Sequence, residues 1–211
     1  MKLIEVEGLA KSIKGRVLFR DLTFRVEGGR ILGVIGPNGS GKSLLLATIA
    51  GITRPDAGSV LICGIDPFRR WGDVLKLMGY QPQNELSPEA MELTPLEYLR
   101  YLLSRCGVKR RERKELASAA LKLFDLDGLE RVRIGELSVG QRAKLRIAGA
   151  IAHNPQVVIF DEPLAPLDPK GREELKRILL ELRSMGKSIV IASNLVDDLE
   201  AISDETLEMG G

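Results

Sequence analysis

The stretch Ile31-Leu-Gly-Val-Ile-Gly-Pro-Asn-Gly-Ser-Gly-Lys-Ser43 (ILGVIGPNGSGKS) joins a short apolar run to a glycine-rich loop. Its first five residues are almost unbroken in apolar character, as expected of a strand that is buried on both faces of a sheet. Residues 36–43 match the pattern G-x-x-x-x-G-K-[ST] at every fixed position, and residues 42–50 predict an apolar helix. Strand, glycine loop and helix in this order predict a phosphate-binding loop.

The residue types of this loop suit phosphate for physical reasons. Glycines let backbone N–H groups surround phosphate oxygens, and the helix adds its partial positive N-terminus at the same point. Lys42 is then expected to reach the β- and γ-phosphates, and the Ser43 hydroxyl to bind Mg²⁺. A chance glycine-rich turn is the competing explanation. The residues predicted to hold the phosphates are Gly36, Pro37, Asn38, Gly39, Ser40, Gly41, Lys42, Ser43 and Leu44.

A second apolar run, residues 157–160, ends on two acids, Asp161 and Glu162. An aspartate at the end of a buried strand can hold Mg²⁺, usually through water. A carboxylate one residue further can orient and activate a water molecule beside a γ-phosphate. An acidic pair that only caps a strand end is the competing explanation, which the phosphate loop elsewhere in the chain disfavours.

Alternating and apolar runs predict further strands around these two motifs. Residues 3–6 and 22–26 alternate in hydrophobicity, and residues 59–62 indicate another strand. An N-terminal antiparallel β part is expected in the fold. Near the other end of the chain, residues 169–185 predict a helix and residues 188–192 a buried strand. The first part of the chain is therefore strand-rich, and the last part contains a buried strand, a helix and another strand.

The middle of the chain has helical periodicity instead. Thr94-Pro-Leu-Glu97 places a capping threonine, a proline at the first helical position and a glutamate three residues on. Further helices are expected over residues 111–124 and 138–152. The fold class is therefore α/β, with an inserted segment that is all-helical.

Composition and charge exclude several classes of protein. The 211 residues are 44% hydrophobic and 28% charged, an ordinary globular balance, and a net charge of +2 favours neither nucleic acid nor membrane. No apolar run approaches the ~20 residues that span a bilayer. The start of the chain alternates and carries acids, unlike a signal peptide. Cys63 and Cys106 are isolated, which fits a reducing cytosol.

The pentapeptide Leu137-Ser-Val-Gly-Gln141 opens one of the predicted helices. Ser138 and Gln141 have the spacing of a capping box, so a helix start is the simplest interpretation. The alternative is a second phosphate contact, in which the Ser138 hydroxyl, the Gly140 amide and the helix N-terminus point at one anion. The pentapeptide alone leaves both open.

The order of these parts resembles that of the ATP-binding-cassette (ABC) ATPases over essentially the whole chain. The phosphate loop is followed by Tyr80-Gln-Pro-Gln83, the helical insertion, Leu137–Gln141, the acidic pair and Leu167-Asp168. The resemblance implies one domain over residues 1–211. Its P-loop NTPase core has a mixed sheet with helices on both faces at about residues 1–85 and 155–211, and its helical subdomain occupies about residues 90–152.

The resemblance also implies roles for single residues. Residues 36–43 would be the Walker A loop, and Leu137–Gln141 the signature motif, whose Ser138, Gly140 and Gln141 contact ATP. The implied Mg²⁺ ligands are Ser43, Gln83 and Asp161. The implied catalytic residues are Lys42, Gln83, Glu162 and Asn194. Asp168 is the implied D-loop aspartate, which also contacts the ATP site.

The distance between two of these motifs implies a partner. About a hundred residues separate the phosphate loop from the signature motif. In the ABC ATPases these motifs enclose one ATP only across a head-to-tail dimer, which makes two equivalent sites. The cofactors implied are ATP and Mg²⁺, and the dimer implied has either two copies of this chain or one copy and a related ABC ATPase.

Two departures from the family pattern concern ATP binding. An aromatic residue that stacks on adenine is usual some two dozen positions before Walker A, and Ile13 stands at the matching position. An aliphatic contact would bind adenine less tightly. The D-loop commonly has a small polar residue before its Leu-Asp, whereas this chain has Ala165-Pro166, and proline fixes its own φ and lacks an N–H donor.

The third departure is Asn194, at the end of the last expected strand, where the family has its switch histidine. An asparagine amide can donate to a γ-phosphate but cannot become cationic, so it stabilises developing negative charge less well. The one histidine, His153, lies in a predicted turn before the second apolar run, where we expect a solvated side chain. Hydrolysis is therefore expected to be slowed and not abolished.

The function predicted is an ATPase subunit that powers a membrane transporter, with a separate transmembrane permease. Residues 93–99 and 135–138 most resemble export-type transporters. Such a subunit would be cytoplasmic and peripheral on the membrane through its permease, and no nucleic-acid partner is expected. The alternatives are a soluble ABC ATPase without a transport role and a catalytically degenerate, nucleotide-gated binding subunit.

Overall fold

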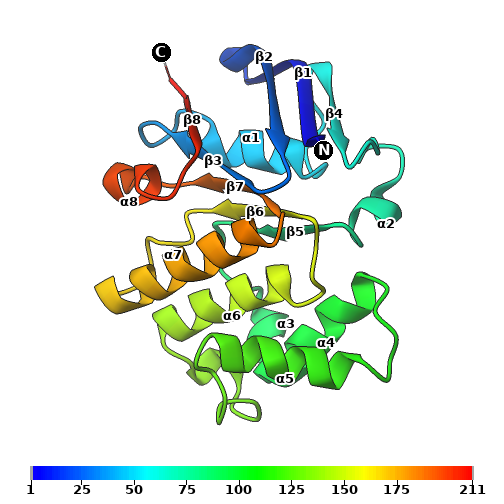
Figure 1. Ribbon diagram of the computed structural model, residues 1–211, viewed down its shortest axis with the longest axis vertical. Helices are drawn as coiled ribbons and strands as arrows, with labels where there is room; N and C mark the ends of the chain where they lie inside the picture. Colours follow the sequence, from blue (N-terminus) through cyan, green and yellow to red (C-terminus); the bar gives the residue numbers. More distant parts are fainter. Residues whose placement is uncertain (1, 211) are drawn as a thin grey trace.

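The computed structural model describes residues 2–210 of the chain. These residues form two β-sheets and a group of helices that lies below the sheets in Figure 1. The elements in chain order are β1 (Lys2–Ile13), β2 (Arg16–Glu27), β3 (Arg30–Ile35), α1 (Lys42–Ile49), β4 (Ala57–Ile62), α2 (Trp71–Val74), β5 (Met78–Gln81), α3 (Pro88–Met91), α4 (Pro95–Arg105), α5 (Arg113–Leu123), the 3-10 helix η1 (Ile134–Glu136), α6 (Val139–Ile151), β6 (Val157–Asp161), α7 (Pro169–Ser184), β7 (Ser188–Ala192), α8 (Val196–Glu200) and β8 (Glu205–Glu208).

The parallel and antiparallel strands form separate sheets. The larger sheet has the order β5-β6-β7-β3-β8, and each of its pairs is parallel. The smaller sheet has the order β2-β1-β4 and is antiparallel. The predicted α/β class, with an antiparallel N-terminal part and a helical insertion, is confirmed.

The central strands β6 and β7 are buried at every position because helices or the smaller sheet cover both faces. Their side chains alternate between two hydrophobic cores. Val158 and Phe160 of β6 pack in the core that contains α6 and α7. Val157 and Ile159 pack in the core that contains α1 and the antiparallel sheet. The near-continuous apolar sequence of these strands follows from this double burial.

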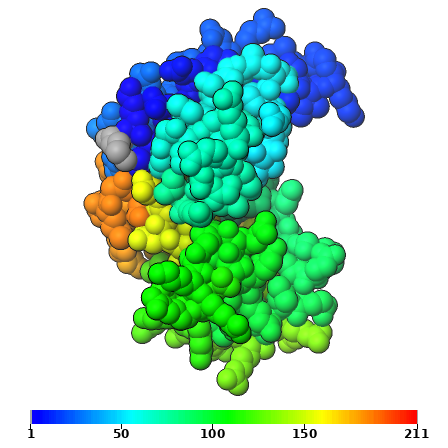
Figure 2. Space-filling model, turned by 90° about the vertical axis from the view of Figure 1, so that its right-hand side faces the viewer, coloured from blue at the N-terminus to red at the C-terminus, as the bar shows by residue number. Residues whose placement is uncertain are grey.

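The helices α3 to α6 lie together at the end of the molecule that is remote from β1 and β2 (Figure 1). The face shown in Figure 2 carries the segment around α2 above this green helical part. The helical part touches the sheet closely at Gly79 of β5, where a Cβ would lie 1.8 Å from the carbonyl oxygen of Ala150 in α6. Glycine at this position therefore lets α6 approach the strand that leads to Gln83.

Several short elements were not predicted from the sequence. These are α2, α3, α8 and β8, each of four or five residues. Elements of this length contain about one turn or two pleats, which is too short for hydrophobic periodicity to stand out. Within residues 2–210, no helix combines the length and the apolar character needed to cross a membrane.

Candidate functional site

The glycine-rich loop joins β3 to α1 at the carboxyl edge of the parallel sheet. Gly36, Gly39 and Gly41 have φ angles of 148°, 78° and 101°, in the region that favours glycine. Gly41 is the N-cap of α1, and no side chain caps the helix there. The first N–H groups of α1 are therefore free of side-chain partners and suited to an anion.

The Lys42 side chain lies at the base of this loop, where the residue is only 6% exposed. Its Nζ donates to the carbonyl oxygens of Gly36 and Pro37, at 2.7 and 3.2 Å, and to Oδ1 of Asn194 at 2.8 Å. Nζ also lies 3.9 Å from Oε1 of Glu162. The structure thus fixes a buried cation between the phosphate loop and the ends of β6 and β7.

Three oxygen-bearing side chains meet beside Lys42. The Ser43 hydroxyl donates to Oδ1 of Asp161 at 3.1 Å and to Oε1 of Gln83 at 3.4 Å. Burial raises the pKa of Asp161, opposed by the bonds from Ser43 and the Gln83 backbone and by the Lys42 cation.

A hard cation such as Mg²⁺ prefers oxygen donors of this kind, and it commonly takes one or two carboxylates and completes its shell with phosphate oxygens and water. In residues 2–210 no three His, Cys, Asp or Glu side chains gather as a metal cluster. Ser43, Gln83 and Asp161 present three oxygen donors, one of them a carboxylate, and this donor set fits Mg²⁺.

The second acid at the end of β6, Glu162, is buried and 6% exposed. Its φ of 51° is left-handed, which is unusual for a residue with a side chain. Its Oε2 accepts a hydrogen bond of 3.0 Å from the backbone N–H of Asn194. Burial raises the pKa of Glu162, against the bond from Asn194 and the charge of Lys42. These neighbours fix a carboxyl group that is available to take a proton.

Asn194 links three parts of the site. Its side-chain oxygen accepts from Lys42, and its Nδ2 donates to Oδ1 of Asn38 at 2.8 Å. Its backbone holds Glu162. The side chain is neutral at every pH, so it orients the lysine without adding positive charge.

A pocket of about 250 Å³ lies beside the phosphate loop. Its lining residues are Leu18, Asn38, Gly39, Gly41, Lys42, Ser43, Leu44, Gln83 and Glu162. Leu18 is the member that the sequence analysis missed. It belongs to β2 but lies over the loop, with its Cβ 3.3 Å from the position that a Cβ on Gly41 would take. The only signal for it in the sequence was its place in the hairpin that follows Ile13.

The remaining predicted site residues do not line this pocket. Ile13 is 46% exposed at the end of the β1–β2 hairpin. Ser138 and Gln141 form a capping box at the start of α6, with bonds of 3.2 and 2.9 Å. Asp168 caps α7 by accepting from the N–H of Gly171 at 2.8 Å. The signature residues therefore stand apart from the phosphate loop of the same chain.

The expectation of a solvated histidine is wrong. His153 is half-buried, both of its ring nitrogens are shielded from solvent, and burial lowers its pKa. The turn after α6 packs its side chain toward β5, in the wall of a groove of about 450 Å³. Other residues of that groove include Trp71, Tyr98, Tyr101 and Arg146.

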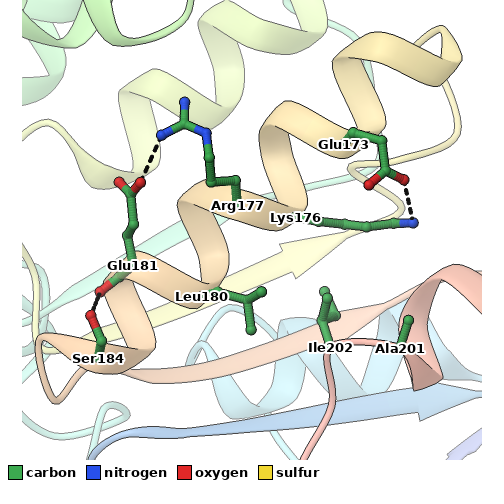
Figure 3. Close-up of a pocket in the computed structure, with 8 residues that line it drawn as sticks. All are labelled: Glu173, Lys176, Arg177, Leu180, Glu181, Ser184, Ala201 and Ile202. Carbon is green, nitrogen blue, oxygen red and sulfur yellow. Dashed lines mark hydrogen bonds and ion pairs between the residues drawn. The ribbon is translucent and has the colours of Figure 1, made fainter.

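A more open groove of about 520 Å³ lies between α7 and the residues that follow α8, Ala201 and Ile202 (Figure 3). Its charged side chains pair with one another, Lys176 with Glu173 and Arg177 with Glu181. It shares no residue with the phosphate loop, and no charged group in it is left to bind a ligand. We assign it no chemistry.

Comparisons with known proteins agree with this geometry. Residues 19–165 match the family model described as ABC transporter. The chain is 33% identical to the energy-coupling factor transporter ATP-binding protein of Fusobacterium nucleatum, across 99% of this chain and 80% of that protein. It is 30% identical to the Nod factor export ATP-binding protein I of Rhizobium etli, across 100% of this chain and 66% of that protein. The chain thus spans about two thirds of the length of that relative.

A solved structure of an ATP-binding subunit of an ABC transporter has the same fold. Its TM-score is 0.89 at 26% identity, and the match covers 98% of this chain and 85% of that chain. The family model covers more than half of the chain, and the phosphate loop and the acidic pair lie within the residues that it matches. The chain belongs to the ATP-hydrolysing subunits of the ABC transporter family.

Proposed function

We propose that this chain powers a membrane transporter of the export type by binding ATP, dimerising head to tail and hydrolysing ATP slowly. The observation that carries the proposal is the hydrogen-bonded convergence of Lys42, Ser43 and Asp161 with Gln83 and Glu162 at one edge of the sheet. Each of these side chains has a distinct use in ATP hydrolysis.

The loop amides and Lys42 would hold the β- and γ-phosphates of ATP. Ser43, Gln83 and Asp161 would hold Mg²⁺, which when bound neutralises charge on the phosphates. Glu162 would accept a proton from water as it attacks the γ-phosphorus. Its bond from the Asn194 N–H keeps one carboxylate oxygen fixed, so the other oxygen, on the side of Lys42, is the one that would take the proton.

Asn194 is the residue that we expect to slow the reaction. Its amide can place a hydrogen-bond donor near a γ-phosphate, but it cannot supply positive charge as the transition state develops. The loss of one charge-assisted contact of this kind costs roughly 2–4 kcal/mol, or ~10²–10³ in rate. The remaining contacts to Lys42 and Asn38 keep the site ordered.

The partner that we propose is a transmembrane permease, docked in the groove between the sheet and the helical part. Two aromatic side chains at this groove, Trp71 and Tyr101, are 37% and 57% exposed. The groove also includes Gln81 and Pro82, directly before the metal-site residue Gln83. A permease element that fills the groove would therefore contact the residues next to Gln83 and influence the ATP site. The chain would lie against the cytoplasmic face of the membrane.

The support for a head-to-tail dimer is the separation of the two phosphate-binding motifs. Ser138, Gly140 and Gln141 are absent from the lining of the pocket beside the phosphate loop. A second chain, related by a two-fold axis, would bring its own signature residues to that pocket. The partner would be another copy of this chain or a related ABC ATPase.

The direction of transport differs between the names of the relatives. The relative from Rhizobium etli is named for export, whereas the relative from Fusobacterium nucleatum is named for an energy-coupling factor transporter. The export type is preferred because of the sequence at residues 93–99 and 135–138.

Phosphate release with Mg-ATP tests the catalytic part of the proposal in three proteins. The unaltered chain should turn over slowly, Asn194→His should be faster by ~10-fold or more, and Glu162→Gln should lose turnover. A rate for the unaltered chain no higher than that of Glu162→Gln would contradict the proposal.

The same experiment addresses the second candidate, a nucleotide-gated binding subunit. The neutral Asn194 bound to Lys42 and the exposed Ile13 favour it. ATP binding without turnover, even in Asn194→His, would establish that candidate instead.

A further inference from the structure

Arg146 of α6 reaches out of the helical part to the loop that follows β5. Its Nη1 lies within hydrogen-bond distance of three successive carbonyl oxygens, those of Pro82 at 3.4 Å, Gln83 at 3.0 Å and Asn84 at 2.5 Å. A guanidinium group that donates to carbonyl oxygens makes charge-assisted bonds, which are stronger than neutral ones. The Arg146 side chain thus holds the backbone of residues 82–84 in the loop.

Two other bonds also hold this loop: the Gln83 backbone bonds to Asp161, and the Gln81 amide donates to the Pro82 carbonyl oxygen. Residues 82–86 belong to no helix or strand, and Gln83 and Asn84 are exposed. Within the part of the chain that the structure describes, the carbonyl oxygens of Gln83 and Asn84 accept from no group other than Arg146. Arg146 is itself partly buried in the groove, and burial lowers its pKa, opposed by the charge of Glu85. Reduced hydration strengthens the bonds that it donates.

The fastened loop carries a side chain of the metal site. Gln83 accepts from the Ser43 hydroxyl at 3.4 Å, and Ser43 bonds to Asp161 at 3.1 Å. Gln83 has a side chain with several rotatable bonds on an exposed loop, so its amide stays beside Ser43 only where its backbone is held. Arg146 lines the groove and not the nucleotide pocket, so it holds that backbone without entering the pocket.

We propose that Arg146 is a positioning residue for Mg²⁺: it anchors the backbone of Gln83 so that the Gln83 amide stands beside Ser43 and Asp161. The inference rests on the proposed function, since it assigns Mg²⁺ to those side chains. Arg146 does not touch the metal or the nucleotide; it acts through Gln83. The helix α6 therefore carries the signature residues at its start and, further along, Arg146, which anchors the metal site.

Mn²⁺ binding measured by electron paramagnetic resonance tests this without turnover, in Glu162→Gln protein with ATP. Arg146→Gln should weaken Mn²⁺ binding by ~10-fold, the usual effect of losing a group that orients a metal ligand. Arg146→Lys should restore part of the loss, because an ammonium group can still donate to one or two carbonyls. Lys144→Gln is the matched control, since Lys144 is a cation of the same helix that pairs with Glu174 at 2.8 Å. It should leave Mn²⁺ binding unchanged.

A double-mutant cycle separates positioning from a general loss of structure. If Arg146 acts through Gln83, then Arg146→Gln should have no further effect in a Gln83→Ala background. Equal weakening of Mn²⁺ binding by Arg146→Gln with and without Gln83 would overturn the inference, and so would unchanged binding in Arg146→Gln. ATP binding in EDTA should persist in every variant. Absence of ATP binding in the parent protein with Mg²⁺ present would instead overturn the proposed function.

Discussion

Two adjacent carboxyl groups at the end of β6 have different surroundings that suit different tasks. Asp161 is bonded by the Ser43 hydroxyl and stands among oxygen donors, which suits a metal ligand. Glu162 turns into the left-handed region and meets the Asn194 N–H and the Lys42 cation. Left-handed backbone costs roughly 1–2 kcal/mol in a residue with a Cβ. We attribute this strain to the need to aim the second carboxyl at the γ-phosphate.

The pKa of Glu162 predicts the acid limb of the ATPase pH profile. Burial raises this pKa above the ordinary value of 4.5. The proton-accepting form of Glu162 is the ionised one, so activity should be full above the raised pKa and fall as pH decreases through it. The limb in kcat/KM, which reports the free enzyme, should therefore lie above pH 4.5. A profile that stays flat down to that pH, with folding verified by circular dichroism, would contradict the assignment.

At the scale of the residue, site residues that belong to a sequence motif were predicted. Site residues that reach the site only through contacts between distant parts of the chain were missed. Lys42, Ser43, Asp161 and Glu162 stand in contiguous patterns, and the structure brings them together. Arg146 donates to a loop 62 to 64 residues away, and no local pattern marks that contact. Leu18, in the pocket lining, was missed for the same reason, and so was the shielding of the His153 ring nitrogens from solvent.

At the scale of the element, the N-terminus of α6 has a structural and a functional role that can be separated. Ser138 accepts from the N–H of Gln141, so Ser138→Ala should lower the free energy of unfolding by about 1 kcal/mol. Ser138→Asp keeps a good cap and should leave stability nearly unchanged, while its charge repels ATP and suppresses turnover. Urea unfolding and phosphate release measure the two effects.

The matched control is Thr94→Ala in the capping box of α4, where Thr94 accepts from the N–H of Glu97 at 3.3 Å. It should lose similar stability and keep turnover. Full activity in Ser138→Asp would show that the end of α6 is only a helix start.

Long helices were predicted better than long strands. The helices α5, α6 and α7 have eleven or more residues and clear periodicity, and they were found within two residues of their ends. The strands β1 and β2 have twelve residues each, but only residues 3–6 and 22–26 were predicted. The strand order was not predictable, because β3 lies between β7 and β8, more than 150 residues further along the chain. Such pairing depends on how crossover helices pack and not on local hydrophobicity.

At the scale of the whole molecule, the two proposed halves of an ATP site lie on different parts of one chain. The sheet carries the phosphate loop, and the helical part carries Ser138. If two copies pair head to tail, each site takes Lys42 from one chain and Ser138 from the other. A lesion in either residue alone then disables both sites of a homodimer.

The head-to-tail dimer therefore predicts that ATPase activity recovers when two inactive variants are mixed. In a dimer of Lys42→Ala with Ser138→Asp, one site combines the intact Lys42 of one chain with the intact Ser138 of the other. With random pairing, half of the dimers are mixed and half of their sites are intact, so about a quarter of the sites should recover. Phosphate release of the mixture should exceed the sum of the two variants measured separately. Activity equal to that sum would mean that copies of this chain do not complete one another's sites, and a related ABC ATPase would then be the required partner.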